Sequence, residues 1–116
     1  MRLLLRRHSP DMAATREQRI VNLLSMAQRA RRIVSGAFAV EQSLKAHKAV
    51  LLILAEDMAE ESRKKFLELA DKYKVPYIEA LDRDMLGSCL GKEYRAMAAL
   101  TDAGFAAQLK KLMEEP

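Results

Sequence analysis

The most constraining feature of the sequence is the apolar run VLLILA at residues 50–55. The run has the length of a single strand, and none of its positions is polar. A strand of this composition requires cover on both of its faces. The run therefore predicts the central strand of a sheet that has helices on either side.

Helical periodicity predicts two helices before this run. The first begins at Thr15, where Gln18 completes a capping box, and ends near Ala30. Its inward positions follow the spacing of one helix face: Ile20, Leu23, Leu24 and Ala27. Ser35 is expected to cap the second helix. The inward residues of that helix are expected to be Ala37, Val40 and Leu44.

Three further helices and three short strands complete the pattern. A long helix is predicted over roughly 60–74, a brief one from Asp82 to Gly91, and a terminal one capped by Asp102. Short strands are predicted at 33–34, 77–78 and 95–101. The inward residues of the long and terminal helices are expected to be Phe66, Leu69, Ala70 and Tyr73, and Phe105, Leu109 and Leu112. This alternation predicts an α/β fold, specifically a three-layer α/β/α sandwich.

The chain is expected to contain one folded domain, at residues 15–116. Its 116 residues suit a single hydrophobic core. Residues 1–14 show no sustained periodicity and contain Pro10, so they are expected to form a disordered basic extension. Met12, just before the first folding signals, is a second candidate for the first translated residue.

Composition favours a soluble, cytoplasmic protein with no membrane partner. No apolar run approaches the ~20 residues that span a bilayer. The opening MRLLLRRHSP is basic, but its run of leucines is far shorter than the apolar part of a signal peptide. Cys89 is the single cysteine, which excludes an internal disulfide and suits a reducing compartment.

Charge is distributed unevenly along the chain. Residues 1–50 contain ten Lys and Arg against three acids, whereas residues 51–116 contain ten against thirteen. Such asymmetry is typical of a cationic face that binds a polyanion. Ordinary solvated helix faces together with a basic tail are the alternative explanation.

The turn at Ser35 and Gly36 is the best candidate for a binding site on the residues alone. Arg31 and Arg32 come just before it, and a helix is predicted to begin directly after it. The free N–H groups at a helix N-terminus carry a partial positive charge that attracts anions. The corner is therefore expected to bind a phosphate or a base edge, with the two arginines beside it. The alternative is a solvated turn without a ligand.

Few groups in the sequence could support catalysis or metal binding. His8, His47 and Cys89 lie far apart and lack the spacing of metal-ligand motifs. Apolar neighbours favour a buried Cys89 thiol over a nucleophile. Glu56 and Asp57 follow the central strand without an accompanying base, so Asp57 is expected to cap the next helix. We therefore expect no enzymatic activity, no cofactor and no metal.

Four segments stand in a distinctive order: NLLSMAQRARRIVSG (22–36), KAVLLILAED (48–57), KYKVPYIEA (72–80) and LGSCLGKEYRAMAALTDAGFA (86–106). Together they resemble the ribosomal-protein family that binds kink-turn RNA (the L-seven-Ae and L-thirty-e group), most closely its small bacterial YlxQ-type members. The resemblance runs from about Gln18 to Lys110. It implies a four-stranded mixed sheet between helical layers. It also implies RNA recognition by the start of the second helix and by the loop before the last strand.

The chain differs from the family at the start of the second helix, where the family's side chains contact bases. That helix usually opens Gly-x-Asn-Glu, with a Lys three residues beyond the Glu, and these side chains read guanine edges. Here Gly36 matches, while the other positions hold Phe38, Ala39 and Gln42. Only Gln42 can hydrogen-bond through its side chain, which puts specific kink-turn binding in question. Phe38 is expected either to stack on an unpaired base or to face the core or a protein partner.

The charged part of the family's site is expected to persist. Arg32 stands where the family usually has Lys, and Arg31 replaces a common Gly. Glu41 is expected to intrude on the cationic face. Lys92 and Arg95 flank the second RNA-facing loop, although they could instead pair with Glu93 or Asp84. The expected RNA contacts are Arg31, Arg32, Ser35, Gly36, Ala37, Phe38, Ala39, Gln42, Lys92 and Arg95.

The sequence therefore favours a non-catalytic, ribosome-associated or structured-RNA-binding protein. Its expected partner is structured RNA, above all ribosomal RNA or the ribosome. The alternative is a protein-interaction module on the same scaffold, with Phe38 at the contact surface. The substrate-binding domain of an RNA methyltransferase is least favoured, because the chain is too short to include the catalytic domain.

Overall fold

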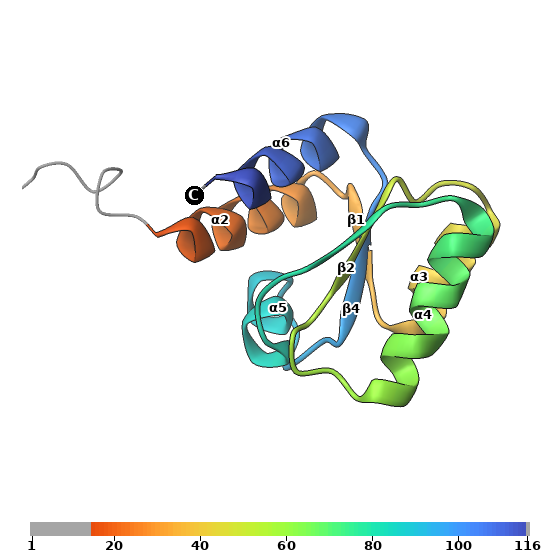
Figure 1. The fold of residues 1–116 in the computed structure, drawn as a ribbon. Coiled ribbons are helices and arrows are strands. Elements are labelled where there is room, and N and C mark those ends of the chain that lie inside the picture. The colour runs from red at the N-terminus through yellow and green to blue at the C-terminus, as the bar shows by residue number, and fades with distance from the viewer. Residues whose placement is uncertain (1–14, 116) are drawn as a thin grey trace, which may run out of the picture.

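A computed structural model of the protein describes residues 15–115, which form five helices and four strands (Figure 1). In chain order these are α2 (Arg16–Arg29), β1 (Ile33–Ser35), α3 (Ala37–Lys45), β2 (Leu51–Leu54), α4 (Glu60–Tyr73), β3 (Tyr77–Glu79), α5 (Arg83–Cys89), β4 (Met97–Leu100) and α6 (Ala103–Glu114). The predicted extension at residues 1–14 lies outside the described residues.

The four strands form one mixed sheet in the order β1-β4-β2-β3. β4 is antiparallel to both of its neighbours, with Ala98 opposite Ile53 on one side and opposite Ser35 on the other. β2 and β3 are parallel. The ends of β1, β2 and β3 therefore meet the start of β4 at one edge of the sheet, which we call the carboxyl edge.

Helices cover both faces of the sheet, as the apolar run at residues 50–55 predicts. α3 and α4 lie against one face, and α2, α5 and α6 lie against the other (Figure 1). Every residue of β2 is completely buried between these layers. The expected three-layer sandwich with a four-stranded mixed sheet is confirmed.

The first helix, α2, closely follows its prediction. The Thr15 hydroxyl accepts a hydrogen bond from the Gln18 N–H at 3.0 Å. The Gln18 side chain does not complete a capping box, because its amide donates instead to Asn22 Oδ1 at 3.1 Å. The predicted inward residues are all buried: Ile20, Leu23, Leu24 and Ala27.

The start of α3 differs from its prediction. Gly36, rather than Ser35, occupies the N-cap position, with φ 90° and ψ 155°. Ser35 is the last residue of β1, where it pairs with Ala98, so its hydroxyl does not cap the helix. Ala37 is exposed, while Val40 and Leu44 are buried as expected. The one-residue shift arises because only glycine readily adopts the positive φ at which the chain leaves the strand.

Strand bounds differ from prediction by one or two residues. β1 and β3 extend to Ser35 and Glu79, while the last strand covers Met97–Leu100 rather than 95–101. It begins late because the N–H of Arg95 donates to the Arg83 carbonyl of α5 instead of to a neighbouring strand.

The caps and inward faces of the later helices mostly agree with prediction. Asp82 and Asp102 each accept a hydrogen bond from the backbone N–H three residues further on, as expected. Phe66, Ala70 and Leu109 are buried. Residues at the margins of the apolar stripes are only partly buried, because an outer helix buries chiefly the centre of its stripe: Leu69, Tyr73, Phe105 and Leu112.

Candidate nucleic-acid interface

Gly36 forms a corner at the carboxyl edge, between β1 and α3. Its N–H donates to the Met97 carbonyl at 3.1 Å, and its own carbonyl accepts from the Val40 N–H at 3.0 Å. The N–H groups of residues 37–39 donate to no acceptor within residues 15–115. These free donors and the helix dipole give the corner a partial positive charge.

The guanidinium of Arg95 lies beside this corner. Its Nε donates to Ser35 Oγ at 3.1 Å, and its Nη1 donates to the Tyr94 carbonyl at 3.0 Å. A Cβ built on Gly36 would lie 3.7 Å from the same Nε. In the described part of the chain, Arg95 forms no ion pair with a carboxylate. The corner therefore holds a fixed cation next to free backbone donors.

Arg31 and Arg32 lie away from the corner, contrary to the prediction. The extended strand β1 lies between them and Gly36. Four residues of extended backbone, at ~3.3 Å each, place Arg32 about 13 Å from Gly36. At this opposite edge, the Arg32 carbonyl accepts from the Thr101 N–H at 2.9 Å. Both arginines are exposed. They form a second cationic site, and the cation beside Gly36 is Arg95.

Arg31 occupies a backbone conformation that favours glycine. Its φ is 59°, in the left-handed region. For a residue with a Cβ this region costs roughly 1–2 kcal/mol. The resemblance places a common Gly at this position, which agrees with the observed geometry. Arg31 thus adds positive charge at the expense of local stability.

Two aromatic side chains stand exposed at the carboxyl edge. Phe38, in the first turn of α3, is 78% exposed, which rules out a core position within this domain. Tyr94, directly before Arg95, is 57% exposed. Sequence reasoning missed Tyr94, although an aromatic residue beside a basic one in the second RNA-facing loop was the available signal. Gln42, one turn beyond Phe38, is also exposed, and Ala39 is partly buried.

The loop 91–95 is held close to α5 by a glycine. A Cβ on Gly87 would meet the Tyr94 Cα at 2.3 Å, so the loop backbone requires a residue without a side chain here. Gly91, with φ 74°, ends the turn after α5. Lys92 is exposed and forms no ion pair among residues 15–115, so the alternative of a pairing with Glu93 or Asp84 is not observed there.

The carboxylate of Glu41, which was expected to intrude on the cationic face, is paired with two lysines. Its carboxylate lies 3.3 Å from Lys65 Nζ and 3.4 Å from Lys45 Nζ. The Lys65 ammonium, and then that of Lys45, lowers the pKa of the Glu41 carboxyl, against an opposing effect of desolvation. The negative charge of Glu41 is therefore matched by two lysines between α3 and α4.

Asp57 caps a different helix from the one predicted. The next helix in the chain, α4, has Ala59 at its N-cap and no side-chain cap. Asp57 Oδ1 instead accepts from the Arg83 N–H at 2.9 Å, at the start of α5. The parallel strands β2 and β3 end at the same edge, which brings α5 beside Asp57. The carboxylate thus has a structural role.

Cys89 is a partly buried thiol in α5, as expected. Its Sγ donates to the Leu86 carbonyl at 3.3 Å. Burial raises the pKa of Cys89 to about 11. A thiol with this pKa is almost entirely protonated near neutral pH and is a poor nucleophile.

We expect Cys89 to react about 100-fold more slowly than glutathione with a disulfide reagent at pH 8, because a raised pKa lowers the thiolate fraction. The rate should increase with pH up to about 11. Release of thionitrobenzoate measures it directly, and unfolding in guanidinium should restore the ordinary thiol rate. If Cys89 in the native protein reacted at a rate within a few-fold of the glutathione rate, burial of its thiol would be contradicted.

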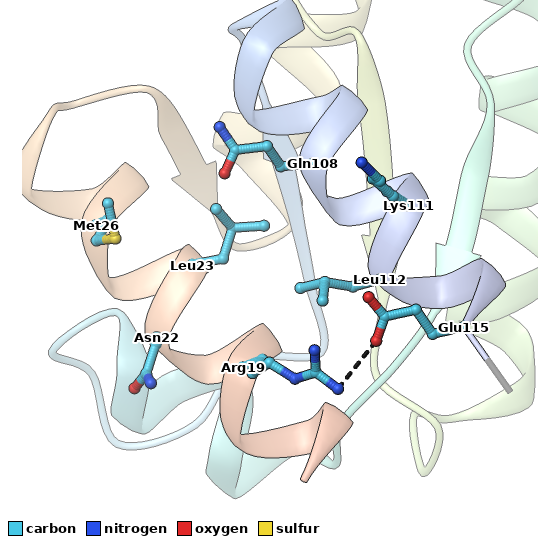
Figure 2. A pocket seen from close by; sticks show the side chains of 8 residues that line it. All are labelled: Arg19, Asn22, Leu23, Met26, Gln108, Lys111, Leu112 and Glu115. Carbon is cyan, nitrogen blue, oxygen red and sulfur yellow. Dashed lines mark ion pairs between the residues drawn. The ribbon is translucent and has the colours of Figure 1, made fainter. Parts of the chain in front are cut away.

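A groove of about 420 Å³ lies between α2 and α6, in the layer opposite α3 (Figure 2). Leu23, Met26 and Leu112 supply its apolar lining. An ion pair between Arg19 and Glu115, at 2.9 Å, closes one end. The groove contains none of the expected RNA contacts, so it is separate from the carboxyl edge.

Residues 15–115 contain no group of three or more His, Cys, Asp or Glu side chains placed to hold a metal ion. Among the helices in this range, none combines the length and the apolar character needed to cross a bilayer.

The fold and the corner define a class of protein: an α/β/α domain with free backbone donors and one fixed guanidinium at the carboxyl edge of its sheet. Residues 18–110 match the family described as "Ribosomal protein L7Ae/L30e/S12e/Gadd45 family". The chain belongs to this family, as the sequence segments predicted. Membership of this family of binding proteins also confirms that the chain is not an enzyme.

Two curated relatives are each named "RNA-binding protein YlxQ". The one from Bacillus subtilis is 40% identical over 92 residues, which cover 79% of this chain and 92% of the relative. The one from Enterococcus faecium is 29% identical over 97 residues, which cover 84% and 93%. The expected similarity to YlxQ-type members is therefore confirmed.

Solved structures share the fold. A protein of unknown function from Bacillus halodurans superposes with a TM-score of 0.78 at 32% identity, covering 83% of this chain and 97% of that one. A Giardia lamblia 15.5 kD RNA-binding protein gives a TM-score of 0.65 at 19% identity, covering 80% and 86%. The second similarity concerns the fold alone.

Proposed function

We propose that this protein binds structured RNA without catalysing a reaction, through the start of α3 and the loop 91–95. The observation that carries the proposal is the guanidinium of Arg95, hydrogen-bonded to Ser35 beside the free N–H groups after Gly36. Fixed guanidinium groups and helix N-termini are both suited to phosphate. Membership of the family and the names of the two curated relatives support RNA as the ligand.

The two cationic regions have separate parts in this proposal. Arg95 and the backbone donors bind one phosphate at the carboxyl edge, and Lys92 adds charge nearby. Arg31 and Arg32 contact the RNA backbone at a second point, at the opposite end of β1. Phosphate contacts of this kind fix the position of an RNA but read little sequence. The RNA is therefore selected mainly by shape, and ribosomal RNA is the structured RNA we propose.

Specific kink-turn recognition receives little support from the side chains at the start of α3. Ala37 and Phe38 are exposed and Ala39 is partly buried, and none offers a side-chain donor or acceptor to a base edge. Each missing edge contact lowers discrimination by ~1–3 kcal/mol. Binding through the backbone and through Arg95 does not depend on those contacts.

A protein-interaction module is the second candidate, because Phe38 is 78% exposed on a folded surface. This function predicts a protein partner that co-purifies after nuclease treatment and is lost in Phe38→Asp.

Affinity for a structured RNA, such as a ribosomal RNA fragment, should fall steeply with salt. The slope of log K against log salt should include ~0.7–0.9 for each phosphate contacted. The double variant Arg31→Gly/Arg32→Ala should weaken binding about tenfold for every RNA sequence and flatten the slope, because two cations are removed. Fluorescence anisotropy at several salt concentrations measures both quantities.

The controls separate RNA contact from folding and from net charge. Glycine adopts the φ of 59° at position 31 easily, so Arg31→Gly should leave the free energy of unfolding unchanged or raise it. Lys110→Ala/Lys111→Ala removes the same number of charges from exposed positions of α6 and should have a much smaller effect. Absence of binding to any structured RNA at low salt would refute the proposed function.

A further inference from the structure

Three connections that lead from a helix into a strand meet at the edge of the sheet opposite the carboxyl edge. Residues 30–32 join α2 to β1, residues 46–50 join α3 to β2, and residues 74–76 join α4 to β3. These three strands run in the same direction, so their starts lie at one end of the sheet (Figure 1). We call the surface formed by the three connections the opposite edge.

Each connection has a basic residue in a conformation that favours glycine. Arg31, His47 and Lys74 have φ of 59°, 59° and 60°, in the left-handed region. Helices commonly end at glycine in this region, because a Cβ is unfavourable there. Among residues 15–115, the only other residue that has a side chain and a positive φ is Leu81, which is buried. Strain that is retained at three equivalent positions indicates a role for the side chains.

The helix ends do not require these basic residues. A cation near a helix C-terminus stabilises the helix dipole, but the effect is confined to the last turn. The last turns of α2, α3 and α4 already contain Arg29, Lys45 and Lys72. The basic side chains beyond the helix ends are therefore available to a ligand.

Contacts within the fold bring the three connections together. The N–H of Thr101, at the end of β4, donates to the Arg32 carbonyl at 2.9 Å. The rings of His47 and Tyr73 lie edge-on with their centres 5.8 Å apart. A hollow of about 290 Å³ lies between the second and third connections, and its lining includes both rings and Lys74. With ~4.8 Å between neighbouring strands, the four-stranded row from β1 to β3 is about 14 Å wide.

Positive charge predominates at this edge. Four exposed cations lie in the connections, and none forms an ion pair within residues 15–115: Arg31, Arg32, Lys48 and Lys74. Two acids lie next to the connections. Asp71 is exposed in the last turn of α4, and Asp102 caps α6 by accepting from the Phe105 N–H. The opposite edge is therefore suited to an anionic partner.

The side chains favour a phosphate backbone over an acidic protein. Residues 30–32, 46–50 and 74–76 include no large exposed hydrophobic side chain, and Tyr77 alone directly follows one of them. A specific protein interface requires an apolar core, whereas nucleic-acid backbones are bound chiefly through cations.

We propose that the opposite edge is a second RNA-binding surface, which holds an RNA segment separate from the one at the carboxyl edge. One protein molecule thereby joins two RNA segments. The inference rests on the proposed function and adds the number of segments bound. The two surfaces end the same strands in opposite directions, so a short hairpin contacts one surface at a time. A larger structured RNA reaches both, in agreement with the loss expected for Arg31→Gly/Arg32→Ala.

A capture experiment tests this bridging. A short RNA hairpin is fixed sparsely to a surface and loaded with the full-length protein at low salt. After free protein is washed away, a fluorescent copy of the hairpin is added. The unmodified protein should capture the second hairpin, and the captured fluorescence should fall steeply as salt is raised. His47→Gly/Lys48→Ala/Lys74→Gly should capture at least tenfold less, while the fixed hairpin retains the same amount of protein within about twofold.

The variants are designed so that unfolding cannot explain a loss of capture. Glycine relieves the left-handed strain at positions 47 and 74, so the triple variant should unfold at the same or a higher temperature. Lys110→Ala/Lys111→Ala removes two lysines from α6, as many as the triple variant removes, and should capture the second hairpin as the unmodified protein does.

Four outcomes would overturn the inference. Protein retained on the fixed hairpin without capture of the second would refute the second surface and leave the proposed function intact. Failure of the fixed hairpin to retain any protein at low salt would refute both. Undiminished capture by the triple variant would place the second hairpin elsewhere or on a second copy of the protein. The same result with loss of a nuclease-resistant protein partner would identify the opposite edge as a protein contact.

Discussion

Replacing Gly87 by alanine is expected to destabilise the fold by about 3 kcal/mol, the range for overpacking a well-packed site. The added methyl group would lie 2.3 Å from the Tyr94 Cα and 2.7 Å from the Tyr94 carbonyl carbon and nitrogen. These are backbone atoms, so no side-chain rotation can relieve the contact. Loop 91–95 must move away from α5. Denaturant unfolding should show a lower midpoint with an unchanged m-value.

Gly91→Ala is the matched control in the same loop. Gly91 has a positive φ of 74°, but a Cβ there meets no heavy atom within 4 Å. Its substitution should therefore cost only the strain of a left-handed residue, roughly 1–2 kcal/mol. If Gly87→Ala cost no more than Gly91→Ala, the close approach of Tyr94 to α5 would be wrong. Weakened RNA binding by Gly87→Ala would follow from the displaced loop.

Local sequence patterns predicted the layers of the fold because each pattern depends only on residues that are close together in the chain. The run at 50–55 has no polar position, so its burial on both faces could be inferred without knowing which helices cover it. The side-chain caps at Thr15, Asp82 and Asp102 were predicted correctly for the same reason. Each hydrogen bond joins residues only three positions apart.

Predictions failed where a distant residue determined the outcome. Ser35 and Gly36 are adjacent and both acceptable N-caps, so the sequence alone did not favour the correct one. In the structure, the hydroxyl of Ser35 is bonded to Arg95, sixty positions away in the chain. Asp57 similarly caps α5, which begins twenty-six positions later, because parallel strands bring the two together.

The predictions for the candidate site failed for the same reason. Arg31 and Arg32 are close to Gly36 in sequence, but an extended strand carries them to the opposite edge of the sheet. The expected cluster of guanidinium groups beside the corner is thus replaced by a single one, from Arg95. Tyr94 was missed because its position at this edge depends on the pairing of β4 with β1 and on the missing side chain at Gly87.

Arg95→Ala should weaken binding of a structured RNA about 100-fold. A hydrogen bond from a charged group contributes ~1.5–3 kcal/mol, and this guanidinium also holds the carbonyl of Tyr94. Loss of one cation should flatten the salt dependence by ~0.7–0.9 in the slope of log K against log salt. Anisotropy titrations over a salt series give the affinity and the slope together. Circular dichroism should show that the fold persists.

Two conservative variants separate the charge of Arg95 from its geometry. Arg95→Lys keeps the charge but lacks the planar fork, so it should retain the salt slope and still lose about tenfold in affinity. Ser35→Ala keeps the guanidinium and removes one of its anchors, so it should lose only a few-fold. If Arg95→Ala bound RNA as tightly as the unmodified protein while Arg31→Gly/Arg32→Ala did not bind, the RNA site would lie at the opposite edge of the sheet. The corner at Gly36 would then be a structural feature of the turn.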